Sequence, residues 1–366
     1  MGSPERAPHC RYVDDGSGPL GQVAFRVETV ATGLEVPWGI AFLPDGSLLV
    51  TERPGRLRLV RNGQLVPEPV AQIPTAAAGE GGLMGIALHP DFAANRLFFL
   101  YYTASVAEGD INRLERYRLA TDGRSATPDR ILLDRIPAAR DHNGGRLRIG
   151  PDGMLYVSTG DAADPDVSQV PRSLAGKILR LTPEGTIPPD NPYTFSPVYL
   201  TGVRNSQGFD WRDPRTMLVT DHGPSGERLR SGHDEVTVAY AGSNLGWPHI
   251  WGCRAQGRLL SPSLSWNDAV PPGGAAIYTG TAISAWHGDL IIGTLQSKHL
   301  HRVSFDRQHP DRVRLHEVYL RGDPPSGYGR LREVVMGPDR HLYVTTSNCD
   351  GRGDCPPDRD RILRLR

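Results

Sequence analysis

One short segment combines a histidine with glycines, which let the backbone adopt the conformations that a reaction centre needs. His142 lies in DHNGG (residues 141–145), where it follows Asp141 and precedes two glycines. A neutral imidazole can take a proton from a hydroxyl group near physiological pH, and glycines let the backbone approach a ligand closely. Asp161, which ends the next expected strand, could orient this imidazole or an arginine. The segment therefore predicts a general base at His142; the alternatives are a histidine and an aspartate that merely cap turns.

Arginines form a second set with possible chemistry. Arg330 and Arg332 lie two residues apart in an expected strand, so both side chains leave the same face. With Arg204 they could bind carboxylates or phosphates, to which a guanidinium offers a planar fork. The alternative is a pair of solvated arginines on an outer strand. Polar residues at corresponding places in the chain are Glu80, Asn205, Gln207, Gln296 and Lys298.

Oxygen donors are concentrated in a third segment. DHGPSGERLRSGHDEV, residues 221–236, combines acidic residues with glycines and a proline that expose backbone carbonyls. Hard cations such as calcium bind carbonyl and carboxylate oxygens of this kind. The spacing differs from that of an EF-hand loop, so the segment alone does not assign a metal.

These polar residues recur in a repeated unit. Around the turn PDG, the sequence aligns with itself as six strand–turn–strand modules, about 45 to 75 residues apart, which is near the size of a propeller blade. We therefore expect an all-β fold, a six-bladed β-propeller, with a ligand site where the inner strands converge. A β-sandwich with a second domain is the rival architecture. It does not explain six like modules between Gly39 and Arg366.

Two strands at the ends of the chain have no copies. They are VAFRVETV near the start and RILRLR at the end. An open sheet edge leaves unpaired backbone groups, so we expect the two strands to close the ring in one shared blade. The propeller should then be a single domain of residues 22–366, preceded by an N-terminal extension of residues 1–21.

Composition narrows the class of protein and its partners. The 42 glycines and 32 prolines favour short strands and turns over long helices. The 41 Lys and Arg residues balance 41 Asp and Glu residues, which argues against nucleic acid or an anionic membrane as a partner. No apolar run reaches the ~20 residues that a membrane helix needs. Met1-Gly2-Ser3 is expected to be an expression remnant in place of a targeting peptide.

The four cysteines form no CxxC pair, which argues against a structural zinc site. Cys349 and Cys355 bracket DGRGD, a polar loop that a disulfide could close. Such a bond suits an oxidising compartment outside the cytoplasm, and unpaired cytosolic thiols are the alternative. The sequence does not indicate how Cys10 and Cys253 pair.

An ordered set of motifs extends from about Val27 to Arg366: EVPWGIAFLPDGSLLVTER, GEGGLMGIALHPDF, DHNGGRLRIGPDGMLYVSTGD, GKILRL, GVRNSQGFDW, DHGP with DEV and GSNLGWP, and GRLREVVMGPDRHLYV. Together they resemble the soluble glucose/sorbosone dehydrogenase family, whose bacterial members include aldose sugar dehydrogenases dependent on pyrroloquinoline quinone (PQQ). The resemblance implies PQQ at the mouth of a six-bladed propeller, with calcium between the quinone and backbone carbonyls. It also implies oxidation of an aldose sugar at C1 to the lactone, with electrons passed to an external acceptor.

The resemblance also implies roles for individual residues. His142 would be the general base, with Asp161 beside it. PQQ is a planar tricarboxylate, so arginines suit its rim. The residues expected at the cofactor are Glu80, Arg204, Asn205, Gln207, Gln296, Lys298, Arg330 and Arg332. The expected calcium ligands are the carbonyls of Gly223 and Pro224 at the catalytic ion, and Glu235 with the carbonyl of Leu245 at a second, structural ion.

Two positions depart from the family pattern. Gln296 stands where some members have a lysine, and Lys298 follows two residues later, on the same face if the segment is extended. Glu80 stands where some members have glutamine. Its carboxylate would repel a tricarboxylate unless calcium or an arginine offsets the charge.

Two other functions suit a propeller. A calcium-dependent lactonase would need a cage of Asp, Glu and Asn side chains, whereas the residues expected to converge here are rich in arginine and glutamine. A non-enzymatic extracellular binding propeller is the other alternative, because fold does not fix function. Such a protein has little reason to keep His142 together with Arg330 and Arg332. The sequence indicates neither which sugar is oxidised nor the oligomeric state.

Overall fold

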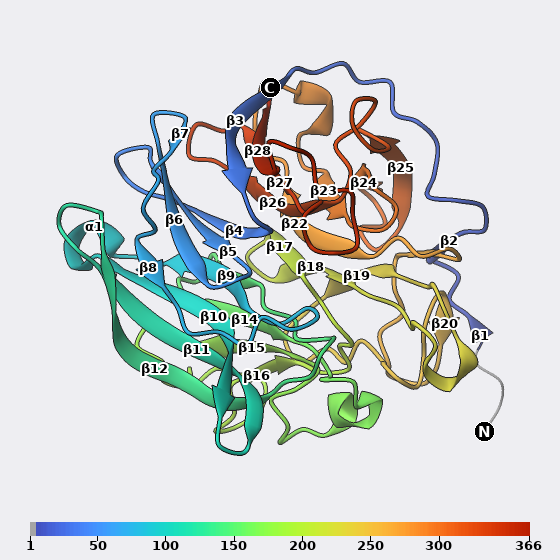
Figure 1. Cartoon of the computed structure of the whole chain (residues 1–366). Helices are drawn as coiled ribbons and strands as arrows, with labels where there is room; N and C mark the ends of the chain where they lie inside the picture. Colours follow the sequence, from blue (N-terminus) through green and yellow to red (C-terminus); the bar gives the residue numbers. More distant parts are fainter. Residues whose placement is uncertain (1–4) are drawn as a thin grey trace.

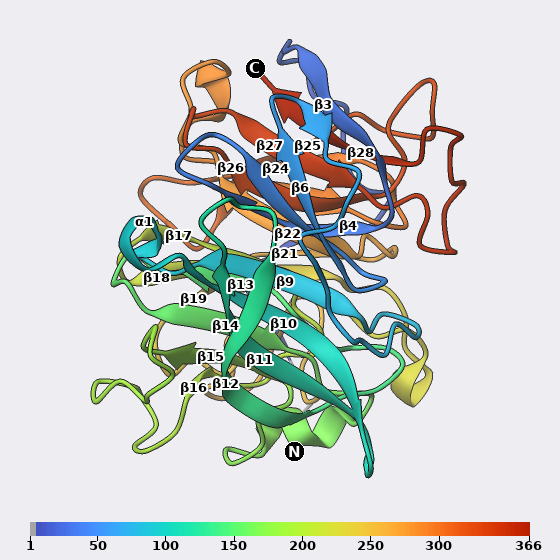
Figure 2. The ribbon, with the colours of Figure 1, turned by 60° about the vertical axis from the view of Figure 1, so that its left-hand side comes forward.

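The computed structural model describes residues 5–366, which consist almost entirely of strands and connecting loops. Six antiparallel sheets follow one another in chain order around a common axis, as Figures 1 and 2 show. The predicted all-β, six-bladed β-propeller is therefore confirmed. No helix among the described residues is long and apolar enough to cross a membrane. Met1-Gly2-Ser3 lies outside the described residues.

Each blade is a meander of four principal strands, named here from the axis outward. The first blade consists of β4 (Pro37–Phe42), β5 (Leu48–Glu52), β6 (Arg56–Arg61) and β7 (Gln64–Leu65), and β8 (Ala71–Gln72) also pairs with β6. The second consists of β9 (Leu83–Leu88), β10 (Leu97–Val106), β11 (Gly109–Leu119) and β12 (Ala126–Pro137). The third consists of β13 (Leu147–Ile149), β14 (Leu155–Thr159), β15 (Lys177–Leu181) and β16 (Val198–Leu200). The next three are β17 (Gly208–Asp213), β18 (Thr216–Asp221), β19 (Glu235–Ala239) and β21 (Leu264–Trp266); β22 (Pro272–Ile277), β23 (Leu290–Thr294), β24 (Leu300–Phe305) and β25 (Val313–Tyr319); and β26 (Leu331–Met336), β27 (Leu342–Thr346), β28 (Asp360–Leu365) and β3 (Val27–Leu34). The described helices are short: α1 (Phe92–Asn95) and the 3-10 helices η1 (Pro165–Gln169), η2 (Glu227–Leu229) and η3 (Ser284–Trp286).

Apolar side chains fill the spaces between neighbouring blades. Strand β10 supplies apolar side chains to both faces of its blade. Phe98 packs in the cluster shared with the first blade, and Phe99 packs in the cluster shared with the third. Successive residues of a strand point to opposite faces, and both faces of a blade are covered. The inner strands therefore read as nearly continuous apolar runs, and this burial fixes where each connecting loop emerges.

A buried ion pair crosses the axis. Arg146, just before β13, pairs with Glu333 of β26, and both side chains are almost wholly buried. The Arg146 guanidinium also lies 4.4 Å from the centre of the Trp38 ring, and its Nε donates to the Gln207 carbonyl at 2.8 Å. These contacts join the third, sixth, first and fourth blades, so the channel is filled beneath the loops that carry the predicted site.

The two ends of the chain close the ring, as predicted. Strand β28 pairs with β3 in antiparallel register, with Arg364 opposite Glu28 and Leu365 opposite Val27. Figure 1 shows the red and blue strands side by side. The sheet edge that an open propeller would expose is thereby covered in the last blade.

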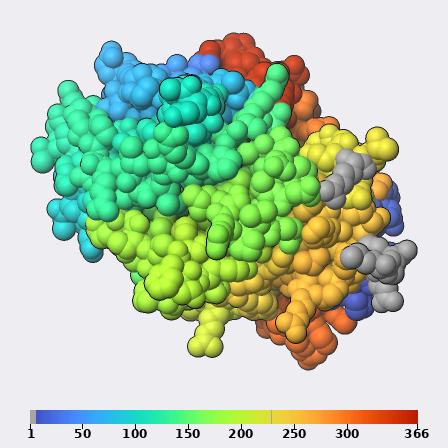
Figure 3. Space-filling model, turned by 90° about the horizontal axis from the view of Figure 1, so that it is seen from below, coloured from blue at the N-terminus to red at the C-terminus, as the bar shows by residue number. Residues whose placement is uncertain are grey.

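The segment before the propeller lies along its outer edge. Strand β2 (Arg11–Val13) pairs in parallel with β21 as a fifth strand of the fourth blade, and β1 (Glu5–Arg6) pairs with β20 (Arg254–Ala255). A disulfide between Cys10 and Cys253 fixes this segment. The blades follow chain order around the face seen in Figure 3, from blue through green and orange to red. The expected boundary between an N-terminal extension of residues 1–21 and a propeller domain of residues 22–366 stays a prediction.

Candidate active site

Loops at one end of the propeller carry the predicted site residues. His142, Arg204 and Arg330 precede the inner strands β13, β17 and β26. Asp161 and Gly223 follow the second strands β14 and β18. In an antiparallel blade the first strand starts at the end where the second strand stops, so these loops meet above the axis. The residues that line a pocket there include Glu80, His222, Gly223, Pro224, Gln296, Arg330 and Arg352.

A buried chain of hydrogen bonds orients His142. Its Nδ1 lies 2.7 Å from Asp161 Oδ1, and Asp161 Oδ2 accepts a 2.8 Å bond from Trp247 Nε1. An ionised carboxylate only accepts hydrogen bonds, so the proton stays on Nδ1 and Nε2 keeps its lone pair. Asp161 is fully buried and His142 is 8% exposed. The arrangement leaves Nε2 of His142 as the atom that can take a proton from a ligand.

Glycines explain why the backbone can bring this pair together. His142 has a left-handed φ of 61°, and its carbonyl packs against Gly160, the residue before Asp161. A Cβ on Gly160 would lie 1.9 Å from the His142 carbonyl oxygen, so no other residue fits without a shift. Gly144, also at positive φ, donates its N–H to Asn205 Oδ1 at 3.0 Å. The glycines of the two motifs thus permit the contact between them.

Glu80 connects the histidine to its surroundings. Its Oε2 accepts hydrogen bonds from the His142 N–H at 3.2 Å and Asn205 Nδ2 at 3.0 Å, while Oε1 pairs with Arg352 at 3.0 Å. Burial by itself would raise the pKa of Glu80, but His222, Arg352 and His142 lower this pKa to about 2. Glu80 is therefore ionised at neutral pH. An arginine offsets its charge, as the sequence argument required of a carboxylate beside an anionic cofactor.

Two predicted arginines form a wall that one aspartate orients. Arg330 Nε and Nη2 each lie 2.9 Å from Asp350 Oδ2, and Arg332 Nη2 lies 3.5 Å from the same atom. Arg332 also donates to Ser347 Oγ and to Gln207 Oε1, both at 2.9 Å. Burial lowers the pKa of Arg332 to about 9, with Asp350 acting in the opposite direction. Gln207 and both arginines therefore meet in one cluster.

Arg204 occupies the side of the site near the histidine. The Asp221 carboxylate accepts its backbone N–H at 2.8 Å, and its guanidinium stacks 5.5 Å from the Trp247 ring. The guanidinium also pairs with Glu227, whose Oε1 lies 3.6 Å from His142 Nε2. Nε of Arg204 is buried with no hydrogen-bond partner among the described residues. One carboxylate therefore already rests between Arg204 and His142.

The predicted calcium ligands fall in two places. Gly223 and Pro224 line the pocket, whereas Glu235 and Leu245 are buried and are not among its lining residues. Glu235 lies opposite Asp221 in the β18–β19 pair. Burial and the nearby charge of Asp221 raise the pKa of Glu235 well above its ordinary value. No group of three His, Cys, Asp or Glu side chains is placed to hold a metal among residues 5–366, so an ion beside Gly223 would depend on carbonyl oxygens.

The fifth-blade loop places its two predicted residues differently. Gln296 is exposed and lines the pocket, but Lys298 is not among the lining residues and forms an ion pair with Asp323 at 2.7 Å. Residues 295–299 form a turn, so the rule that alternate residues share a face of a strand does not apply to them. A role for Lys298 at a cofactor stays a prediction.

Four residues of the site were not expected from the sequence: Trp247, Glu227, Asp350 and Arg352. Trp247 holds Asp161 from a loop 86 residues further along the chain. Asp350 and Arg352 belong to the loop that the predicted Cys349–Cys355 disulfide closes, and that disulfide is confirmed. The sequence signal for this loop was the pair of cysteines around DGRGD. The cysteine pair predicted that a disulfide closes the loop, but not that the charged side chains of Asp350 and Arg352 take part in the site.

The donor set suits a planar tricarboxylate with a hard cation. Glu227 shows that the corner between Arg204 and His142 accepts a carboxylate. Arg330 is among the residues that line the pocket, so a second carboxylate there would meet a charge-assisted donor. The backbone of Gly223 lines the same pocket, and backbone carbonyls are ligands that calcium accepts. The residues present therefore fit PQQ with calcium.

Comparisons with known proteins point to one family. The glucose/sorbosone dehydrogenase family model matches residues 34–363. Aldose sugar dehydrogenase YliI of Escherichia coli is 31% identical over 89% of this chain and 91% of its own length. The PQQ-bound aldose sugar dehydrogenase of Streptomyces coelicolor is 35% identical, with a TM-score of 0.82 over 95% of this chain and 99% of that one. A Thermus thermophilus protein provisionally described as a glucose dehydrogenase is 44% identical, with a TM-score of 0.84 over 94% of this chain and 100% of that one. The chain belongs to the glucose/sorbosone dehydrogenase family and is a sugar dehydrogenase of the quinoprotein type.

Proposed function

We propose that the protein oxidises an aldose at C1 to the lactone, with PQQ as hydride acceptor and an external acceptor for the electrons. The observation that carries this proposal is the chain from Trp247 through Asp161 to His142, whose backbone N–H is bound by Glu80 of the pocket that Arg330 lines. Proton removal and anion binding are the two demands that this reaction makes of the protein. The PQQ-bound relative supports the choice of cofactor.

The wall would hold the cofactor through its carboxylates. Arg330 and Arg332 provide forked donors, and Gln207 keeps Arg332 in place at 2.9 Å. Arg204 and Asn205 would bind the end near the histidine, where Glu227 must give up its contact with Arg204. When bound, the quinone supplies a two-electron acceptor for hydride. These interactions orient the cofactor against the sugar.

The calcium ligands belong to the same proposal. The carbonyls of Gly223 and Pro224 would hold an ion at the cofactor, where a cation favours negative charge on oxygen. Glu235 and the carbonyl of Leu245 would hold a second ion. Burial raises the pKa of Glu235 in the protein alone, and a cation beside it would favour the ionised form.

His142 would take the proton of the anomeric hydroxyl. Asp161 fixes its Nδ1–H and stabilises the imidazolium that forms, as carboxylates do for catalytic histidines. The C1 hydrogen leaves as hydride, with both electrons of its bond, while the hydroxyl proton passes to Nε2, so the sugar loses two electrons and two hydrogen nuclei in this step. The product carbonyl at C1 is that of a lactone.

A reconstitution experiment tests the proposal. The protein is mixed with PQQ and calcium, and dye reduction is followed with a panel of aldoses and their methyl glycosides. We expect turnover of one or more aldoses and none of the methyl glycosides, because their anomeric oxygen carries no proton. No cofactor binding and no turnover would reject the dehydrogenase. Lactone hydrolysis with calcium alone would instead support the calcium-dependent lactonase. Absence of both activities would support the non-enzymatic binding propeller.

The two disulfides support a location outside the cytoplasm, since such bonds persist in oxidising compartments. We include this location in the proposal. Mass analysis of the protein isolated from each cell fraction, with thiols blocked at lysis, checks it. Reduced cysteines in a cytoplasmic fraction would contradict it.

A further inference from the structure

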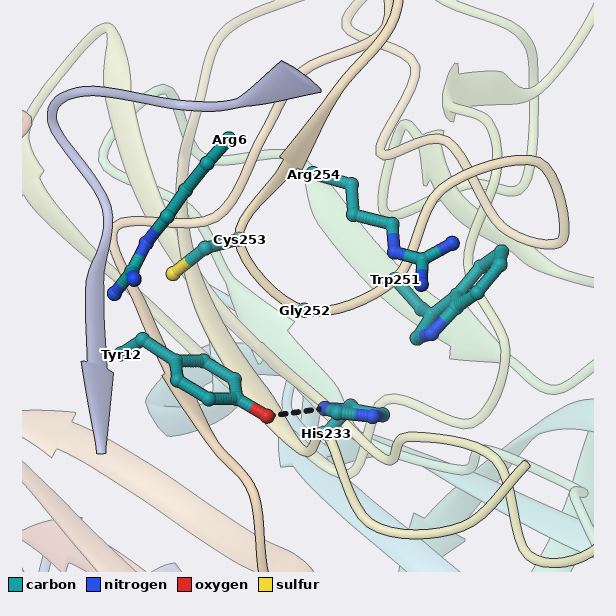
Figure 4. A pocket seen from close by; sticks show the side chains of 7 residues that line it. All are labelled: Arg6, Tyr12, His233, Trp251, Gly252, Cys253 and Arg254. Atoms are coloured by element: carbon teal, nitrogen blue, oxygen red, sulfur yellow. Dashed lines mark hydrogen bonds between the residues drawn. The ribbon is translucent and has the colours of Figure 1, made fainter. Parts of the chain in front are cut away.

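A second pocket lies on the fourth blade, outside the candidate active site. It has a volume of ≈ 280 Å³. Figure 4 shows the side chains that line it, which combine two arginines, three aromatic rings and a disulfide sulfur: Arg6, Tyr12, His233, Trp251, Gly252, Cys253 and Arg254. This mixture of cationic and aromatic groups is unlike the apolar spaces between the blades.

The two pockets share a wall. Gly232 and Asp234 line the candidate active site, and His233 between them lines the second pocket. Gly232 and His233 have left-handed φ values of 74° and 62°, so the backbone turns here, and this one stretch of backbone borders both spaces. A ligand held in the second pocket therefore lies next to the site where the proposed reaction occurs.

Positive charge gathers at the second pocket. Arg6 and Arg254 are directly opposite in the β1–β20 pair, a position in which like charges are unfavourable. Neither forms an ion pair with a carboxylate among the side chains that the structure describes; Arg6 lies 5.4 Å from the Tyr12 ring centre and Arg254 3.6 Å from that of Trp251. Figure 4 shows the two side chains pointing away from each other, Arg6 toward Tyr12 and Arg254 toward Trp251, so each side of the pocket carries a cation.

A third guanidinium adds to the field. Arg230 stacks 3.2 Å from the centre of the same Trp251 ring that Arg254 contacts. His233 Nδ1 lies 3.3 Å from Tyr12 Oη. The imidazole can exchange hydrogen bonds with a ligand hydroxyl, whereas the arginines supply the charge.

The walls are fixed before any ligand binds. The Cys10–Cys253 disulfide joins the N-terminal segment to the loop that carries Arg254. Tyr12 Oη donates to Asn267 Oδ1 at 2.8 Å and lies 3.3 Å from His233 Nδ1, the contact drawn in Figure 4. A preorganised pocket loses less conformational entropy on binding than a flexible one does.

We propose that this pocket binds the acidic unit of an anionic sugar, with Arg254 at its carboxylate or phosphate, Arg6 adding positive charge from the side of Tyr12, and Tyr12 and His233 at its hydroxyls. The choice of a sugar rests on the proposed function, because the shared wall places this unit beside the aldose that would be oxidised. The anion site itself rests only on two arginines that line one formed pocket.

Calorimetry on the protein without added cofactor tests the proposal. The probes are methyl β-glucuronide, methyl β-glucoside and inorganic phosphate. Neither glycoside can be oxidised at C1, so the result does not depend on the dehydrogenase activity. We expect the glucuronide to bind at least about tenfold more tightly than the glucoside, since a charge-assisted contact is worth that much. Arg254→Gln should weaken glucuronide binding by about tenfold or more.

Arg258→Gln is the matched control, because Arg258 is exposed on the same loop and does not line the pocket. It should bind the glucuronide as the unchanged protein does. Arg6→Gln gives a second test should Arg254→Gln not fold. Equal binding of glucuronide and glucoside, or no loss in either pocket variant, would overturn the proposal. Phosphate binding without glucuronide binding would identify a plain anion site and overturn the acidic sugar.

Discussion

The proton-transfer corner and the arginine wall of the site are held in different ways. The corner, formed by His142, Asp161 and Trp247, is a linear chain of hydrogen bonds in which every member is buried. The wall, formed by Arg330 and Arg332, depends on Asp350. Asp350 lies between two bonded cysteines that are six positions apart in the sequence. The corner is thus fixed by hydrogen bonds between buried loop residues, and the wall by contacts to a loop that a disulfide closes.

This difference separates chemistry from affinity. A change in the corner alters the atom that takes the proton but leaves the guanidiniums in place. A change in the wall alters the charge that meets the cofactor but leaves the histidine hydrogen-bonded to Asp161. The comparison therefore predicts two classes of variant, and each substitution below should fall in one class only.

The largest effect is expected for His142→Ala. Loss of a general base should lower kcat by about 10² to 10⁴-fold, while the affinity for PQQ changes little because the arginines remain. The measurement is steady-state dye reduction together with a PQQ titration followed by absorbance. Full activity in this variant would assign the base to another group. Loss of PQQ binding in a folded variant would show that the proton-transfer corner also contributes to cofactor affinity, against the separation of corner and wall.

Arg332→Ala should have the next largest effect and belongs to the other class. Removing a buried, charge-assisted donor should weaken PQQ binding by roughly 10 to 100-fold, whereas kcat at saturating cofactor should change much less. Arg332→Lys is the informative companion, because a lysine keeps the charge but not the fork. A lysine variant that binds as tightly as the original protein would show that charge alone is required. A fall in kcat at saturating PQQ would contradict the separation.

Trp247→Phe makes a smaller, more specific change in the corner. The ring is kept, but Asp161 Oδ2 loses the donor at 2.8 Å. A hydrogen bond to a charged group contributes about 1.5 kcal/mol, so kcat should fall by about tenfold. Because the lost donor stabilised the ionised form of Asp161, the acidic limb of the kcat profile should move to higher pH. An unchanged pH profile would mean that Trp247 acts only by packing.

The sequence predicted what depends on local pattern and missed what depends on distant contacts. Six repeats gave the propeller, and glycines around His142 and Asp161 marked the pair that the structure joins at 2.7 Å. Trp247 escaped because its contact with Asp161 spans 86 residues and its motif has no catalytic residue type. Lys298 was placed by a strand rule, but its segment forms a turn. Side-chain direction in a turn cannot be read from spacing.

The smallest effect is expected from removing the disulfide that closes the loop beside the arginine wall. Replacing both Cys349 and Cys355 with serine should lower the free energy of unfolding by about 2 kcal/mol, from loop entropy. Asp350 and Arg352 should then sample more positions, so PQQ affinity should fall a few-fold, with kcat unchanged. The matched control is the Cys10→Ser/Cys253→Ser pair, whose bond spans 243 residues and lies away from the wall. The same entropy model assigns that bond about 5 kcal/mol, yet its removal should leave PQQ affinity intact in the folded protein. If both pairs weaken PQQ equally, affinity follows global stability, and the Cys349–Cys355 disulfide has no special part in holding the wall.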